Sequence, residues 1–182
     1  MAWNLGLLGA ASLVAAPDTY DLLETQILPS AATSITFSSL GNYAANYQHL
    51  QLRHDSDGYT TYGNFVMRIN GDATASNYRY HHFYGGGGTP GAGSGAEPLI
   101  NYQWVAGPSS QVIDLYDAFS TSKFKTSKSF NGNTIAGTGI VGVMSHLWKN
   151  TAAINSITIL NERQNLPSGS RFSLYGLGGV SA

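Results

Sequence analysis

Four acidic residues are the candidates for hydrolytic chemistry: Glu97, Asp114, Asp117 and Glu162. A glycosidase needs two carboxyl groups that face each other across the bond to be cleaved. Asp114 and Asp117 lie three residues apart in a probable strand, where side chains an odd number apart point to opposite faces. The chain also has no cysteine and no G-x-S-x-G motif for a serine nucleophile. The sequence therefore predicts that the protein is not an enzyme, with a glycan hydrolase as the weaker alternative.

A second group of residues could hold a metal ion: His49, His54, Asp55 and Asp57. Imidazoles and carboxylates that are close in sequence can share one cation. His49 and His54 are five residues apart, however, so they face opposite sides of a continuous strand. The segment DSDG, residues 55–58, has its glycine in the wrong place for a helical calcium loop. We expect a solvated turn between strands here in preference to a calcium site, and we predict no metal.

The glycine-rich segment contains a formal G-x-G-x-x-G match at Gly86, Gly88 and Gly91. In a dinucleotide-binding loop this motif leads into a helix whose N-terminus meets the pyrophosphate. Here Pro90 lies inside the motif and no helical pattern follows. The sequence therefore predicts no dinucleotide and no other cofactor.

Aromatic residues gather in the middle of the chain beside this glycine-rich segment: Tyr59, Tyr62, Tyr78, Tyr80, Tyr84, Tyr102 and Trp104. On exposed loops such residues stack on sugar rings or anchor a partner surface. Large aromatic residues are also favoured in strands, where they pack in the core or across strands. Tyr84 and Trp104 flank the glycine-rich segment and are the better candidates for glycan or partner contact.

The composition restricts the class of protein. The 182 residues suffice for one β domain, and only 10% of them are charged. A net charge of −1 and a pI near 6.5 leave no basic stripe for binding phosphates, so we predict no nucleic acid partner. Because the chain has no cysteine, its stability must come from packing, backbone hydrogen bonds and association with other chains.

Alternation of apolar and polar residues predicts an all-β protein. In residues 34–38 Ile35 and Phe37 share one face, and in NFVMRING Phe65, Met67 and Ile69 do the same before an Asn-Gly turn. Eight to ten such strands without an internal repeat predict an antiparallel, jelly-roll-like β-sandwich that occupies residues 20–182 as a single domain. Residues 85–98 combine many glycines with two prolines, and we expect a mobile surface loop there.

Residues 1–19 are predicted to form an extended apolar arm ahead of this domain. A signal peptide needs Lys or Arg before its apolar run, and the run MAWNLGLLGAASLVAA has neither. The run is also too short to span a bilayer, so we predict no membrane insertion. A cleaved signal peptide is the weaker alternative. Docking on a partner would bury Trp3, Leu5, Leu7 and Leu8, whereas packing of the arm on its own domain is the competing possibility.

Several segments of the chain carry a resemblance to known proteins: DLLETQIL near the start, YQHLQLR, MRINGD followed by NYRYH, VIDLYDA with KFKT, LWKNTAAINSITI and the closing GSRFSLYGL. Together these segments, from about residue 20 to residue 177, resemble a family of tailed-bacteriophage virion proteins. Members of that family, common in phages of aquatic bacteria including cyanophages, are small β-sandwich proteins of the particle surface. They are described as head-decoration, cement, tail-fibre or structural proteins.

The resemblance implies a non-enzymatic virion protein on the particle surface, either on the head or on the tail. It implies that residues 70–72 and 170–176 maintain the sandwich and do no chemistry. The leading expectation is a capsid decoration or cement protein, trimeric by family likeness, with residues 1 to 30 docked on the major capsid protein or on tail proteins. The alternative is a tail-fibre or tail-associated module that binds a host surface glycan.

Overall fold

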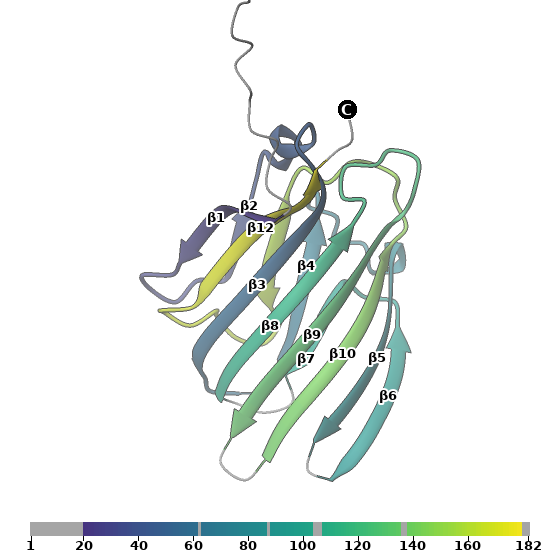
Figure 1. The fold of residues 1–182 in the computed structure, drawn as a ribbon. Helices are drawn as coiled ribbons and strands as arrows, with labels where there is room; N and C mark the ends of the chain where they lie inside the picture. The colour runs from purple at the N-terminus through teal and green to yellow at the C-terminus, as the bar shows by residue number, and fades with distance from the viewer. Residues whose placement is uncertain (1–19, 62, 87, 104–106, 136–137, 180–182) are drawn as a thin grey trace, which may run out of the picture.

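The computed structural model describes residues 20–61, 63–86, 88–103, 107–135 and 138–179 (Figure 1). This part of the chain folds into strands and two short 3-10 helices, at Leu40–Tyr43 and Ala75–Asn77. The strands are β1 (Tyr20–Ile27), β2 (Ser34–Phe37), β3 (Tyr47–Tyr59), β4 (Gly63–Ile69), β5 (Tyr78–Gly86), β6 (Thr89–Gly95), β7 (Leu99–Gln103), β8 (Gly107–Tyr116), β9 (Lys125–Ile135), β10 (Thr138–Trp148), β11 (Ile157–Asn161) and β12 (Arg171–Gly179).

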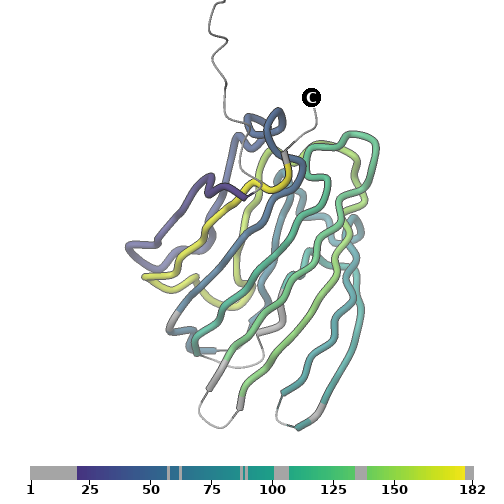
Figure 2. Tube along the Cα trace, in the orientation of Figure 1, coloured from purple at the N-terminus to yellow at the C-terminus, as the bar shows by residue number. Residues whose placement is uncertain are grey.

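The strands form two antiparallel sheets that pack as a sandwich, as the sequence predicted. The large sheet has the order β1-β12-β3-β8-β9-β10-β5-β6, and the small sheet has the order β2-β11-β4-β7. In Figure 1 the large sheet faces the viewer and the small sheet lies behind it. The first and last strands of the described chain, β1 and β12, run side by side at one edge (Figure 2).

The strand order is that of a jelly roll with two inserted hairpins. The four strands β1-β12-β3-β8 face the small sheet, and each sheet pairs early strands with late ones, as a jelly roll does. The hairpin β5–β6 is inserted between β4 and β7, and the hairpin β9–β10 between β8 and β11. Both hairpins add to the β8 edge, so they extend the large sheet on one side only.

The main core lies between the two sheets, and alternation along the strands creates it. In β8 the buried residues Ile113 and Leu115 alternate with the partly exposed Val112, Asp114 and Tyr116. The small sheet contributes Phe37, Phe65 and Ile159, and β12 contributes Phe172 and Leu174, all almost fully buried.

The turn at Asn70 and Gly71 is confirmed and holds neighbouring elements together. Both residues have positive φ, 51° and 72°, and the amide of Asp72 donates to the carbonyl of Ile69 at 2.9 Å. The Asn70 side chain donates to the Ala153 carbonyl and accepts hydrogen bonds from the amides of residues 155 and 156. Asn70 therefore ties the turn to the segment that leads into β11.

The expectation of a mobile loop at residues 85–98 is wrong, because β5 continues to Gly86 and β6 covers Thr89–Gly95. In the register of this hairpin Gly93 lies opposite His82 and Gly95 opposite Tyr80. A Cβ atom at Gly93 would lie 2.8 Å from the His82 ring, and one at Gly95 would lie 2.6 Å from the Tyr80 hydroxyl. The glycines therefore make room for aromatic rings that lie over the edge strand.

Two further expectations from the sequence are corrected. Residues 55–58 do not form a turn between strands, because β3 runs through them with an irregular register between Ser56 and Tyr59. The described chain has twelve strands and not eight to ten. The two that alternation missed are β6 and β1, and β1 has a register shift between Leu22 and Glu24 that breaks its pattern.

Candidate interaction surface

The outward face of the large sheet carries an uncharged apolar area on the inserted hairpins and the adjoining strand β8. One cross-strand row runs Val112, Phe130, Val143, Phe83 and Ala92, from β8 to β6. The next row runs Gly132, Val141, Gly85 and Pro90, from β9 to β6. We call these nine residues the outer-face patch.

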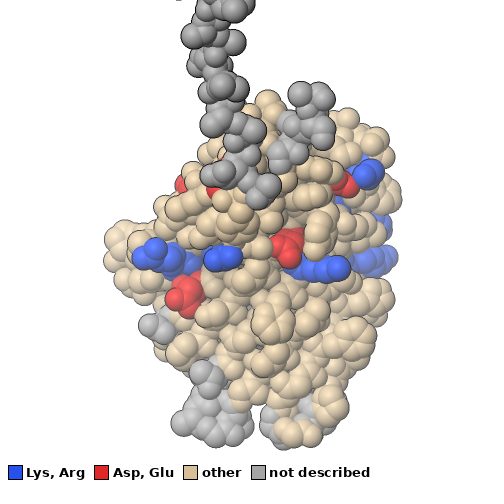
Figure 3. Space-filling view, viewed as in Figure 1, with Lys and Arg blue, Asp and Glu red and all other residues tan. Residues whose placement is uncertain are grey.

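The patch is open to solvent in spite of its composition. Phe83 is 68% exposed, Phe130 57%, Val141 54% and Val143 46%. Figure 3 shows a band of charged side chains across the middle of this side of the molecule, further charged side chains above it and an uncharged surface below it. Contiguous exposed apolar surface of this kind commonly marks an interaction site.

The band beside the patch is a row of polar and charged side chains: His81, Ser145, Lys128, Asp114, Gln51 and Tyr175. Its members hold one another in place. The Gln51 amide donates to the Asp114 carboxylate at 2.7 Å, and the Lys128 ammonium lies 5.8 Å from the centre of the Tyr116 ring. Burial, with a further contribution from the Asp114 carboxylate, raises the pKa of Tyr116.

Arg53 organises the end of this band near β1. Its guanidinium lies 5.3 Å from the centre of the Tyr20 ring and 4.9 Å from that of Tyr175. The two rings stack with their centres 4.9 Å apart. Burial raises the pKa of Tyr20, and the neighbouring Arg53 charge partly opposes this. A shallow depression next to this cluster is lined by Arg53, Asp55, Ser110, Arg171 and Tyr175 among others.

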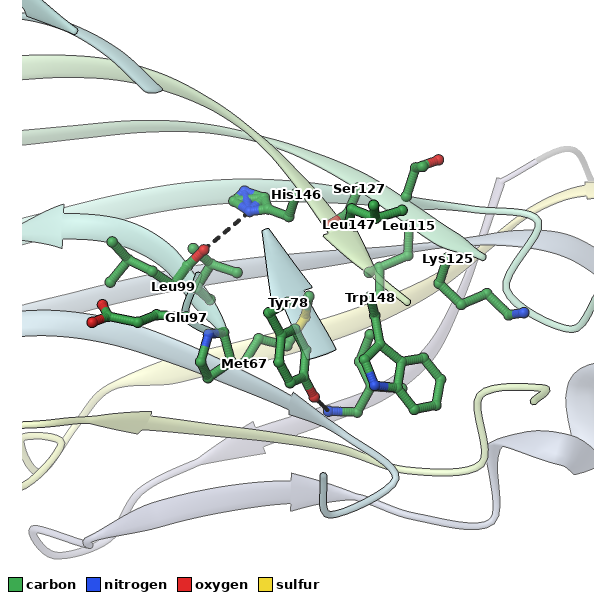
Figure 4. Close-up of a pocket in the computed structure, with 14 residues that line it drawn as sticks. Met67, Tyr78, Glu97, Leu99, Leu115, Lys125, Ser127, His146, Leu147 and Trp148 are labelled. Carbon is green, nitrogen blue, oxygen red and sulfur yellow. Dashed lines mark hydrogen bonds between the residues drawn. The ribbon is translucent and has the colours of Figure 1, made fainter. Parts of the chain in front are cut away.

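A small cavity between the sheets belongs to the core (Figure 4). Its volume is about 10 Å³, about the least that one water molecule needs. His146 at its wall shares a hydrogen bond of 3.1 Å with the Leu99 carbonyl, and the Tyr78 hydroxyl accepts one from the Ile69 amide. The Lys125 ammonium donates to three backbone carbonyls. These polar groups have partners within the protein, and a cavity of this volume is too small for a substrate.

Three of the four candidate catalytic carboxylates lie in different parts of the fold. Asp114 lies on the outward face of β8, whereas Asp117 lies in the turn after that strand, where its carboxylate accepts a 2.7 Å hydrogen bond from Lys123. The hydrogen bond from Lys123, with one from Gln48, lowers the pKa of Asp117. Glu162 follows β11 of the small sheet and accepts a hydrogen bond from Asn64.

No group of three or more His, Asp or Glu side chains that could hold a metal ion is found among the described residues. His54 is buried against Phe172, with ring centres 4.5 Å apart, while Asp55 points outward and accepts a hydrogen bond from Ser110. The half-buried His49 lies outside the core, where its Nδ1 accepts a 2.8 Å hydrogen bond from the Asp117 amide, so the expectation that His49 and His54 face opposite sides of the strand is confirmed.

Of the predicted contact residues, Trp3, Leu5, Leu7, Leu8 and Trp104 lie outside the described residues. Tyr84 does not flank a loop, because it lies within β5 opposite Gly91 of β6. Its ring is half-buried and lies 5.8 Å from that of His82. Contact of Tyr84 or Trp104 with a glycan stays a prediction.

The outer-face patch is the surface that sequence reasoning missed. Its one signal was in β10, where Val141 and Val143 alternate with Gly142 and Met144, so that neither face of the strand is polar. Strands with two apolar faces are typical of sheets covered on both sides. That pattern could have indicated a covered outward face.

A scan of protein-family models finds none that matches this chain, and a search of curated proteins finds no relative. Within the described residues, neither helix is long and apolar enough to cross a membrane.

Proposed function

We propose that the protein is a non-enzymatic structural protein of a tailed-phage virion, displayed on the particle surface as a capsid decoration or cement protein. The observation that carries this proposal is the open outer-face patch, in a chain whose described residues hold no group of three or more side chains that could bind a metal ion. Jelly rolls are common among capsid domains, but they also occur in lectins, so the fold alone does not decide the function. The sequence resemblance to virion proteins supports the first of these.

In this proposal residues 1 to 30 attach the domain to the major capsid protein or to tail proteins. The described chain begins in β1, which is an edge strand of the large sheet. Within β1, Leu22 is 58% exposed and Ile27 is 52% exposed. These exposed side chains would extend the apolar surface that Trp3, Leu5, Leu7 and Leu8 offer to the particle.

Attachment is tested by adding the purified chain to particles of the encoding phage that lack it, followed by sedimentation. We expect the native chain to co-sediment, and a variant with serine at positions 3, 5, 7 and 8 to stay in the supernatant. Phe124→Ser is the matched control, because Phe124 is 51% exposed and lies far from the arm in sequence. Equal binding of the arm variant and the native chain would count against attachment through the arm.

A tail-associated carbohydrate-binding module is the second candidate. It is favoured by the shallow depression in which Tyr175, Arg53, Asp55 and Arg171 place an aromatic ring beside hydrogen-bonding groups. Glycan-array binding that is lost in Arg171→Ala or Trp104→Ala would support it. A native chain that binds none of the host-derived glycans would remove this candidate and leave display or cementing.

A further inference from the structure

The outer-face patch offers almost nothing for a polar ligand to recognise. Its side chains are those of Phe, Val, Ala and Pro, together with two glycines, so none of them donates or accepts a hydrogen bond. It spans five neighbouring strands, β8, β9, β10, β5 and β6. A sugar placed on it would leave its hydroxyl groups unpaired, whereas the apolar surface of another protein would match it.

We infer that a second copy of this chain packs its own outer-face patch against this one. This inference goes beyond the proposed function, which concerns attachment to the particle through residues 1 to 30. An uncharged apolar patch is complementary to itself, because two copies can approach without repulsion between like charges.

The exposed area is sufficient for the centre of such an interface. With about 200 Å² for a whole phenylalanine side chain, the exposed fractions of Phe83 and Phe130, 68% and 57%, amount to roughly 250 Å². Val141 and Val143, each about half exposed, and the outward side of β6 add to this. A stable interface buries about 800 Å² on each partner, of which the rim is normally polar.

The polar band next to the patch suits that rim. Lys128 and Asp114 are direct cross-strand neighbours, so the border of the patch carries both signs of charge. When a second copy packs in the opposite direction, each charge can meet its opposite. Growth of the sheet through its β6 edge is disfavoured, because Pro90 in this strand has no amide hydrogen to donate. Next to the patch, contact between copies is therefore expected face to face.

The test is the molar mass of the full chain between 1 and 100 µM, measured by size-exclusion chromatography with light scattering. We expect the native chain and Phe124→Ser to be oligomers, and Phe83→Ser/Phe130→Ser to elute at the monomer mass of 19.3 kDa. Circular dichroism should show the same β-structure in all three. Phe124 is the matched control because it is also an exposed phenylalanine but lies outside the patch.

A second variant guards against a folding defect in the double variant. Val143→Lys places one charge at the centre of the patch, at a position that is 46% exposed, and should also give a folded monomer. A native chain that is monomeric at 100 µM would overturn the inference. That outcome would also hold if the patch served only to bind the particle or a glycan. Oligomers that persist in both Phe83→Ser/Phe130→Ser and Val143→Lys would overturn it equally.

Discussion

Three buried histidines, His54, His82 and His146, should make the protein sensitive to mild acid, because burial lowers the pKa of each. The His54 ring packs against Phe172 and Phe65, with its Nε2 3.4 Å from the Tyr59 hydroxyl. Burial lowers the pKa of His54 to about 3, although the nearby Asp55 charge slightly opposes this. His146 lies between the Ser129 hydroxyl and a backbone carbonyl, and burial lowers its pKa to about 4.

The size of the effect follows from the difference between the folded and unfolded pKa values. The imidazoles of His54 and His146 both titrate near 6.5 in the unfolded chain. In the folded protein His146 stays neutral until the pH reaches about 4, and His54 until it reaches about 3. Below pH 6.5 the unfolded state therefore binds more protons than the folded state, and the free energy of unfolding decreases as the pH is lowered. At pH 5 each histidine costs about 2 kcal/mol, or about 4 kcal/mol for both, which lowers Tm by roughly 8 to 16 °C in a chain of this length.

The assay is thermal and urea unfolding of the native chain at pH 7.5 and pH 5.0, at one protein concentration. We expect His54→Phe and His146→Gln each to remove about 2 kcal/mol of the difference in unfolding free energy between the two pH values. His81→Gln is the control, because His81 lies exposed on the outward face of β5. Equal stability of the native chain at both pH values, or loss of the pH dependence in His81→Gln, would refute the reasoning.

Three substitutions test the packing. Gly95→Val should lower the free energy of unfolding by about 2 kcal/mol, because the valine side chain would overlap the facing tyrosine. Ser94→Val, on the opposite face of β6, should change it by less than about 0.5 kcal/mol. Thermal unfolding compares the two variants. Asp72→Ala should cost about 2 kcal/mol in urea unfolding, because the Trp148 indole loses its acceptor at 2.8 Å. Lys125→Met should cost about 2 kcal/mol in the same assay, since three carbonyls lose their donor.

The substitutions at Gly95 and Asp72 each have an outcome that would contradict the reasoning. If Gly95→Val is as stable as Ser94→Val, the aromatic rings do not require glycine on β6. Asp72 also binds Asn77 and the Thr74 amide, and these hydrogen bonds, led by that from Trp148, outweigh burial and hold the pKa of its carboxyl at about 2. If Asp72→Asn and Asp72→Ala are both as stable as the native chain, the turn does not depend on this side chain.

Alternation allowed the sequence to predict which residues face the core in most strands. Ile35 and Phe37 were placed on one face of their strand, and both are buried, while Thr36 between them is exposed. This works because strand side chains have a strict period of two, whatever the strand pairs with.

The glycine-rich hairpin could not be predicted in the same way. Glycine content reports the entropy lost on ordering a segment, which argues for a loop. The stabilising partners of Gly93 and Gly95 are the rings of His82 and Tyr80 on the preceding strand. Only the register of the hairpin shows that these glycines are needed beneath the rings.

The outer-face patch escaped prediction for a different reason. Alternation assigns Phe83, Phe130 and Val143 to one face of their strands, but it does not say whether another layer covers that face. That depends on which strands lie at the edge of the small sheet and on which face the inserted hairpins leave open, both of which are features of topology.

The proposed function is tested most directly by cryo-electron microscopy of the particle of the phage that encodes this chain. We predict density for the β-sandwich at symmetry-related sites on the capsid, with residues 1–19, ahead of β1, between shell subunits. Density at the tail alone would favour the adhesin alternative. Particles that contain no copy of the chain, by density and by mass spectrometry, would contradict the virion proposal.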